Sequence, residues 1–173
     1  ILHEFATVFK PLHKEGAIDL YPESLAKQID EWNEKLAIAV NDGVYGMGFA
    51  KTQDEYDLAF NRFFDTLDEV EERLSNQRYI NGNSITETDI RFYTTMIRFD
   101  VVYYGMYEAN KKRIEEYSNI FNYLKDLYQT PGFGDTTNFE AIKVGYYLSG
   151  GREIVPGGPS VDKWQEPHDR LRF

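Results

Sequence analysis

TETDIRF, residues 86–92, marks the start of the most apolar helix that the sequence predicts. Thr86 and Asp89 have the spacing of a capping box, in which the acid reaches back to the backbone N–H of the threonine. The next residues, 90–103, are apolar on most sides. A helix without a polar face belongs in the interior of a protein, so this stretch predicts the centre of a helical bundle.

Further helices are indicated on both sides of this central one. After Pro22, apolar residues recur at steps of four and three as far as Asn41, which predicts one amphipathic helix. A second capping box, Thr52 with Glu55, starts a regular apolar stripe that ends near residue 74. Shorter helices are predicted over residues 107–116, 118–128 and 137–148. No segment alternates like a strand, so the predicted fold is all-α, with about six helices around a buried centre.

The chain divides into three parts on composition. Residues 1–18 lack an initiating Met and carry apolar side chains that would make a poor free terminus, so we expect a fragment of a longer protein. Residues 19–148 hold the predicted helices. Residues 149–173 are rich in glycine and proline, which predicts an irregular tail.

Composition excludes several classes of function. The formal charge of −10 repels phosphate backbones, so we expect no nucleic-acid partner. The absence of cysteine excludes disulfides, zinc–thiolate sites and thiol catalysis within these 173 residues. The three histidines have no ligand spacing, so we expect no metal. We find neither a membrane-length apolar run nor a signal peptide, which favours a cytoplasmic protein.

Glycine and tyrosine supply the candidate site. The stretch NDGVYGMGFA, residues 41–50, matches no phosphate-binding fingerprint and is interpreted as a glycine turn between two helices that carries Tyr45. Other tyrosines gather near the ends of predicted helices, at positions Tyr103, Tyr104, Tyr107, Tyr146 and Tyr147. A phenol is a flat apolar ring with a donor and acceptor, which suits an oxygenated aromatic ligand. Composition alone favours the alternative that these are core or interface tyrosines.

Six motifs carry a family resemblance. In chain order they are DLYPESL (19–25), NDGVYGMGFAKTQDEYD (41–57), TETDIRFYTTMIRFDVVY (86–103), NIFNYLKDLYQTPG (119–132), NFEAIKVGYY (138–147) and IVPGGP (154–159). The capped TETDIRF helix resembles the core helix of the glutathione transferase C-terminal domain. The six motifs together resemble the Xi class of that family, the glutathionyl-hydroquinone reductases.

The resemblance implies a two-domain enzyme. Its other domain would be thioredoxin-like, bind the co-substrate glutathione and carry the catalytic cysteine, and residues 1–18 would then be a remnant of the linker. The cysteine would take glutathione from a glutathionyl-hydroquinone, and a second glutathione would resolve the mixed disulfide. The helical domain would supply the pocket for the aromatic ring. The resemblance also implies a homodimer, no metal, and no activity for this segment alone.

The same resemblance implies site residues. Tyr45 matches the tyrosine of the family's GVY motif, and Tyr146 or Tyr147 matches that of its IK-x-x-YY motif, with Tyr146 favoured. Both Tyr45 and Tyr146 are expected to be catalytic, and Tyr103 is a weaker candidate for the pocket wall. Gly145 departs from the His that is frequent in the family, which bears on substrate range. The alternatives are a non-catalytic helical interaction module and a transferase or dehalogenase with another acceptor.

Overall fold

The predicted central helix is α5 (Glu87–Arg98), which continues into a turn of π-helix, η4 (Phe99–Tyr103). The computed structural model describes residues 1–173 and is helical, with one isolated β-bridge and no strand. α5 contacts α1 (Leu2–Ala6), α2 (Ala26–Leu36) and α7 (Ser118–Gln129). The all-α fold around a buried central helix is therefore confirmed.

The start of α5 is organised by one buried carboxylate. Asp89 is fully buried and forms the predicted capping box with Thr86, whose backbone N–H donates to it at 2.8 Å. The same carboxylate accepts hydrogen bonds from the Thr86 hydroxyl (3.0 Å), the backbone N–H of Ile80 (3.0 Å) and the hydroxyl of Tyr123 (2.8 Å). Asp89 thus joins α5 to the preceding turn and to α7.

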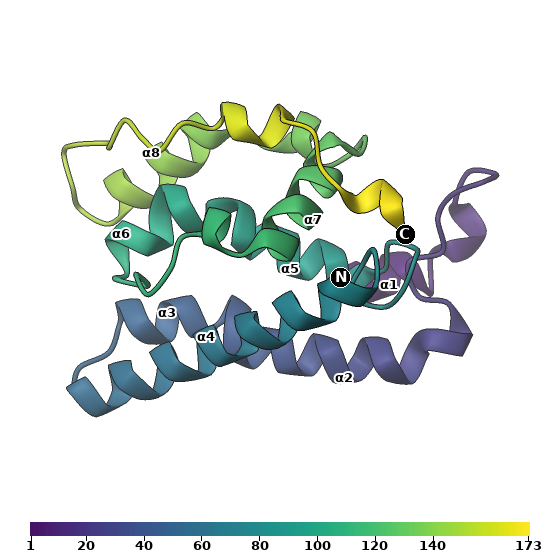
Figure 1. The fold of residues 1–173 in the computed structure, drawn as a ribbon, viewed down its shortest axis with the longest axis horizontal. Helices are drawn as coiled ribbons and strands as arrows, with labels where there is room; N and C mark the ends of the chain where they lie inside the picture. The colour runs from purple at the N-terminus through teal and green to yellow at the C-terminus, as the bar shows by residue number, and fades with distance from the viewer.

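The helices form two layers in Figure 1. One layer holds α2, the π-helical turn η3 (Ala37–Asn41), α3 (Gly43–Gly48) and the long α4 (Gln53–Asn76). The other holds α5, α6 (Tyr104–Met106), α7 and α8 (Phe139–Ser149). Short 3₁₀ turns complete the chain: η1 (Lys10–Leu12), η2 (Glu23–Leu25), η5 (Ile114–Glu116), η6 (Gly134–Thr136), η7 (Asp162–Gln165) and η8 (Arg170–Arg172).

The glycine-rich stretch corrects one prediction. Residues 43–48 are not a turn but the helix α3, and none of its three glycines has a positive φ. Their use is close packing. A Cβ on Gly46 would lie 3.2 Å from the Cβ of Ala59 on α4, and one on Gly48 would lie 2.5 Å from the ring of Tyr107. Glycine here allows α3 to lie close to α4 and to Tyr107. The periodicity of apolar residues along the sequence does not reveal such contacts.

The helix predicted over residues 107–116 is wrong apart from the short η5. Glu108 has φ 58°, a left-handed conformation that ends helical geometry in this segment. The loop is fixed instead by Asp100, which is buried and accepts a hydrogen bond from the backbone N–H of Ile114 at 3.1 Å. At the start of the following helix, α7, Glu71 of α4 accepts hydrogen bonds from the backbone N–H groups of Asn119 and Ile120.

The tail is irregular, as predicted, and it is packed. In Figure 1 the yellow segment runs from α8 back across α7. Trp164 is buried, and Lys163 pairs with Asp100 at 2.8 Å. Arg170 is fully buried, and its guanidinium donates to the carbonyls of Leu74 (2.9 Å), Gln77 and Arg78 (3.0 Å). These carbonyls belong to the last turn of α4 and to the two residues that follow the helix, so the tail caps a helix from which it is far removed in sequence.

Residues 1–18 are also attached to the bundle. Ala6 of α1 is buried, and Nδ1 of His3 lies 3.4 Å from Oε2 of the buried Glu87. The role of this segment as an interdomain linker remains a prediction. None of the helices combines the length and apolar character that crossing a bilayer would need.

We predict that Asp89→Ala lowers the free energy of unfolding by at least about 3 kcal/mol, because four donors lose a buried acceptor. Asn138→Ala is the matched control. It removes the exposed cap of α8, an Asn138 Oδ1 that accepts from Ala141 N–H at 2.9 Å, and should cost about 1 kcal/mol. Urea unfolding followed by circular dichroism measures both. Equal losses would contradict the central role of Asp89.

We predict that Arg170→Met lowers the free energy of unfolding by about 2 kcal/mol, since the last carbonyls of α4 lose their donors. Arg172→Met is the control, because Arg172 is half exposed and its ion pair with Asp169 lies at the surface. It should change stability by less than about 0.5 kcal/mol. Indistinguishable unfolding curves for the two variants would show that the tail does not hold α4.

Candidate functional site

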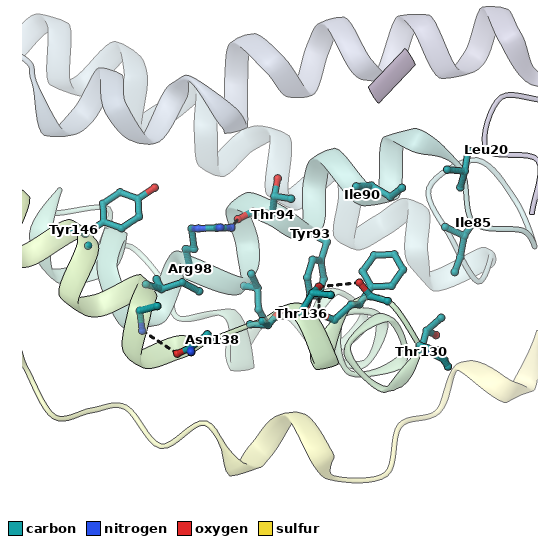
Figure 2. Close-up of a pocket in the computed structure, with 18 of the residues that line it drawn as sticks. Leu20, Ile85, Ile90, Tyr93, Thr94, Arg98, Thr130, Thr136, Asn138 and Tyr146 are labelled. Carbon is teal, nitrogen blue, oxygen red and sulfur yellow. Dashed lines mark hydrogen bonds between the residues drawn. The ribbon is translucent and has the colours of Figure 1, made fainter. Parts of the chain in front are cut away.

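A large cleft opens between α5, α8 and the N-terminal segment. Its volume is about 1560 Å³, and residues from several elements line it, among them Leu20, Tyr93, Phe133 and Ile142. Figure 2 shows Tyr93, Thr94 and Arg98 of α5 on one wall, with Tyr146 of α8 at one end. The mixture of apolar rings with a few polar groups is typical of a small-molecule site.

Three phenol groups converge at the Tyr146 end of this cleft. The hydroxyl oxygen of Tyr146 lies 2.8 Å from that of Tyr45 and 2.6 Å from that of Tyr103. The oxygens of Tyr45 and Tyr103 are 3.4 Å apart. The three residues come from α8, α3 and η4, so three separate elements must meet to form this tyrosine cluster.

Helix irregularities and glycine place the cluster. A π-helical turn precedes α3 and another contains Tyr103, and each adds a residue that rotates the next part of the chain by about 100° relative to a regular helix. The ring of Tyr107 packs against those of Tyr45 and Tyr103. It stacks on Tyr103 at 5.6 Å between centroids and lies 5.5 Å from Tyr45, in the space that Gly48 leaves free.

Burial sets the protonation of the cluster. Burial raises the pKa of Tyr146 to about 12, and the neighbouring charge of Arg98 acts in the opposite direction. Burial and the hydrogen bonds to Tyr146 and Tyr45 raise the pKa of Tyr103 far above its ordinary value. Both phenols are therefore protonated at neutral pH, so the cluster is a source of hydrogen-bond donors rather than of a base.

The candidate tyrosines differ in their access to the cleft. Tyr146 lines it, whereas Tyr45 and Tyr103 lie behind the wall, where they contact the lining residues Tyr146 and Tyr107. Tyr147 is 5% exposed, and the Arg152 guanidinium lies 5.5 Å from its ring centroid. Tyr147 does not line the cleft, so of the two adjacent tyrosines Tyr146 faces it. Tyr104 packs against Arg113 instead.

Two further residues line the cleft: Arg98, which was not among the predicted site residues, and Gly145, which was predicted only to bear on substrate range. Arg98 has no carboxylate within 4 Å. Gly145 also lines the cleft, and a Cβ built there would meet nothing within 4 Å. The position therefore has room for a larger side chain.

Comparison with known proteins defines the class of this domain. Residues 53–126 match the family described as "Glutathione S-transferase, C-terminal domain". The glutathionyl-hydroquinone reductase of Escherichia coli is 42% identical over 178 residues, which cover 100% of this chain and 54% of the relative. A glutathione-bound structure of that protein superposes with a TM-score of 0.89 and 40% identity, covering 99% of this chain and 56% of that one. This chain is a helical domain of the glutathione transferase C-terminal type.

The solved structures also show to which class of that family the chain belongs. A structure of the Xi-class transferase of Natrialba magadii superposes with a TM-score of 0.93 at 36% identity, covering 99% of this chain and 54% of that one. The chain belongs to the Xi class, with relatives named glutathionyl-hydroquinone reductases. It spans about half the length of the curated relatives it matches.

We predict opposite effects from two glycine substitutions. Gly48→Ala should lower the free energy of unfolding by about 1–3 kcal/mol and disturb the tyrosine cluster, because the new methyl group overlaps Tyr107. Gly145→Ala lies in helix α8 with open space around it, so it should raise stability by up to about 1 kcal/mol. Thermal unfolding measures both, and near-ultraviolet circular dichroism reports on the tyrosines. Destabilisation of equal size would contradict the close approach at Gly48.

Proposed function

We propose that this chain is the substrate-binding half of a glutathionyl-hydroquinone reductase. The observation that carries the proposal is the tyrosine cluster, in which hydroxyls from three elements meet at 2.6–3.4 Å beside an apolar cleft. Relatives that bear this name support it, as does the glutathione-bound E. coli structure. The aromatic ring of a glutathionyl-hydroquinone would lie in the cleft with a ring oxygen toward Tyr146.

The proposed reaction uses a cysteine of a second, thioredoxin-like domain, because this chain has no thiol. The ring carbon that bears the sulfur is first protonated while the neighbouring ring hydroxyl loses its proton, which gives the keto tautomer. The thiolate then attacks the sulfur, a disulfide to glutathione forms, and the bond between sulfur and ring carbon breaks. Its electron pair moves through the ring onto the ring oxygen, which restores the aromatic ring as a phenolate that then takes a proton. The thiolate of a second glutathione attacks the mixed disulfide, which releases oxidised glutathione and restores the cysteine.

The phenols act on the charge that develops in this step. As the electron pair enters the ring, negative charge is delocalised onto the ring oxygen. Tyr146 is protonated at neutral pH and donates a hydrogen bond to that oxygen, while Tyr45 and Tyr103 orient its hydroxyl. Donors fixed before the reaction stabilise such charge without reorganisation. Tyr45 becomes the second donor if the ligand displaces its contact with Tyr146, in keeping with the catalytic role expected of both.

We expect the assembled enzyme to be a cytoplasmic homodimer that uses glutathione and no metal, as the family resemblance implies. A chimera tests the proposal. The part of the E. coli reductase that this chain does not match is joined to residues 1–173. We predict that the chimera converts S-(2,5-dihydroxyphenyl)glutathione to hydroquinone in the presence of glutathione, and that residues 1–173 alone do not. Release of hydroquinone is measured by liquid chromatography.

In the chimera, Tyr146→Phe should lower kcat by about 100-fold, because the ring oxygen loses its donor. Tyr45→Phe should lower it less, since Tyr45 acts partly through Tyr146. Tyr147→Phe is the matched control on the same helix and should keep nearly full activity, because this ring does not line the cleft. Wild-type turnover by Tyr146→Phe in a folded chimera would remove the phenol from the mechanism.

A further inference from the structure

The charges that line the cleft are the reverse of those on the protein as a whole. The chain carries 29 acidic and 19 basic residues. A random set of 30 of its residues would hold about five carboxylates, yet the 30 lining residues include none. They do include three basic side chains, Lys14, Arg98 and Arg152. In a chain of net charge −10, this is a local field that favours an anion.

Arg98 is the inner cation of the three. It is half-buried, whereas Lys14 and Arg152 are exposed at the rim. Figure 2 shows Arg98 on the α5 wall between Tyr146 and Thr94. Its only hydrogen bond within the chain is from one guanidinium nitrogen to the carbonyl of Thr94 on its own helix. The remaining N–H groups have no acceptor in the protein, which leaves them for a ligand.

The nearby charges of the chain do not neutralise this arginine. Two other arginines of this region have partners within the chain. Arg91 pairs with Glu87 at 3.4 Å, and the Arg152 guanidinium lies 5.5 Å from the Tyr147 ring centroid. Asp135 lies between the lining residues Phe133 and Thr136 but does not itself line the cleft, and its carboxylate accepts a hydrogen bond from the backbone N–H of Gly132 at 2.8 Å. Arg98 forms no ion pair with any carboxylate of the chain within 4 Å.

We propose that Arg98 is a specificity-determining residue that binds a negatively charged group on the aromatic ring of the ligand. This rests on the proposed function, because it assigns a preference to the same cleft. A planar guanidinium matches a carboxylate or sulfonate with two parallel hydrogen bonds. The open space beside Gly145 leaves room for a ring that carries such a substituent. The preferred ligands are thus hydroquinones substituted with an acidic group.

A matched pair of probes tests this without turnover. Binding of 2,5-dihydroxybenzoate and of the neutral 2,5-dihydroxybenzamide to residues 1–173 is measured by isothermal titration calorimetry. The two differ in charge and hardly in size. We expect the carboxylate to bind about tenfold more tightly, a modest ratio because Arg98 is partly solvated. Equal affinities, or no binding of either probe, would overturn the proposal.

Variants assign the preference to one residue. Arg98→Gln should reduce the tenfold ratio to about one, while Arg98→Lys should keep part of it because the charge remains. Arg62→Gln, an exposed arginine of α4 outside the cleft, makes the same change of net charge and should leave the ratio intact. A ratio that persists in Arg98→Gln would overturn the assignment.

A third probe distinguishes an anionic group on the aromatic ring from the carboxylates of the glutathionyl moiety. S-methylglutathione carries carboxylates but no aromatic ring. If Arg98→Gln weakens S-methylglutathione and leaves the preference for dihydroxybenzoate unchanged, Arg98 binds the glutathionyl moiety and the proposal is wrong. Because all of these readouts are binding constants, they are independent of hydroquinone release by the chimera. An inactive chimera with a tenfold ratio would contradict only the proposed function.

Discussion

The hydrogen bonds of Asp89 are the constraint on which the rest of the structure depends. A carboxylate removed from water is costly unless donors surround it, and here four donors from three segments converge on one side chain. Burial raises the pKa of Asp89, and these hydrogen bonds act in the opposite direction. The arrangement fixes where α5 begins and which way it points. Every element that packs on α5 takes its position from that start.

The site lies at the opposite end of the same helix. α5 passes into η4, which carries Tyr103 to the cluster, and α8 packs against η4 to bring Tyr146 alongside. The third phenol comes from α3, held close by glycines that replace side-chain bulk. A shift in the start of α5 would therefore be transmitted through a packed helix to all three hydroxyls. Dense packing makes such transmission direct, because interiors deform little.

Features that depend on residues close together in the sequence were predicted, and features that depend on distant residues were not. The box of Thr86 with Asp89 and that of Thr52 with Glu55 are decided within four residues, and both were predicted correctly. The helix α3 was missed because Gly46 and Gly48 matter through distant neighbours, Ala59 and Tyr107. No local sequence pattern indicated the left-handed Glu108 or the π-helical turns either. The tyrosines were predicted as candidates from the family resemblance, but their convergence depends on contacts between residues 43 to 101 positions apart.

The chemistry of the cleft results from placing the phenols of the tyrosine cluster and the guanidinium cation of Arg98 in the same half-buried space. Burial keeps the phenols protonated, so they offer hydrogens to an oxygen that gains charge and offer little to one that does not. The guanidinium of Arg98 attracts an anionic ligand group in the ground state and in the transition state alike. Under the proposed function, the tyrosine cluster would accelerate the reaction and the arginine would select the ligand. The two roles would then be divided between neutral, protonated phenols and a guanidinium cation.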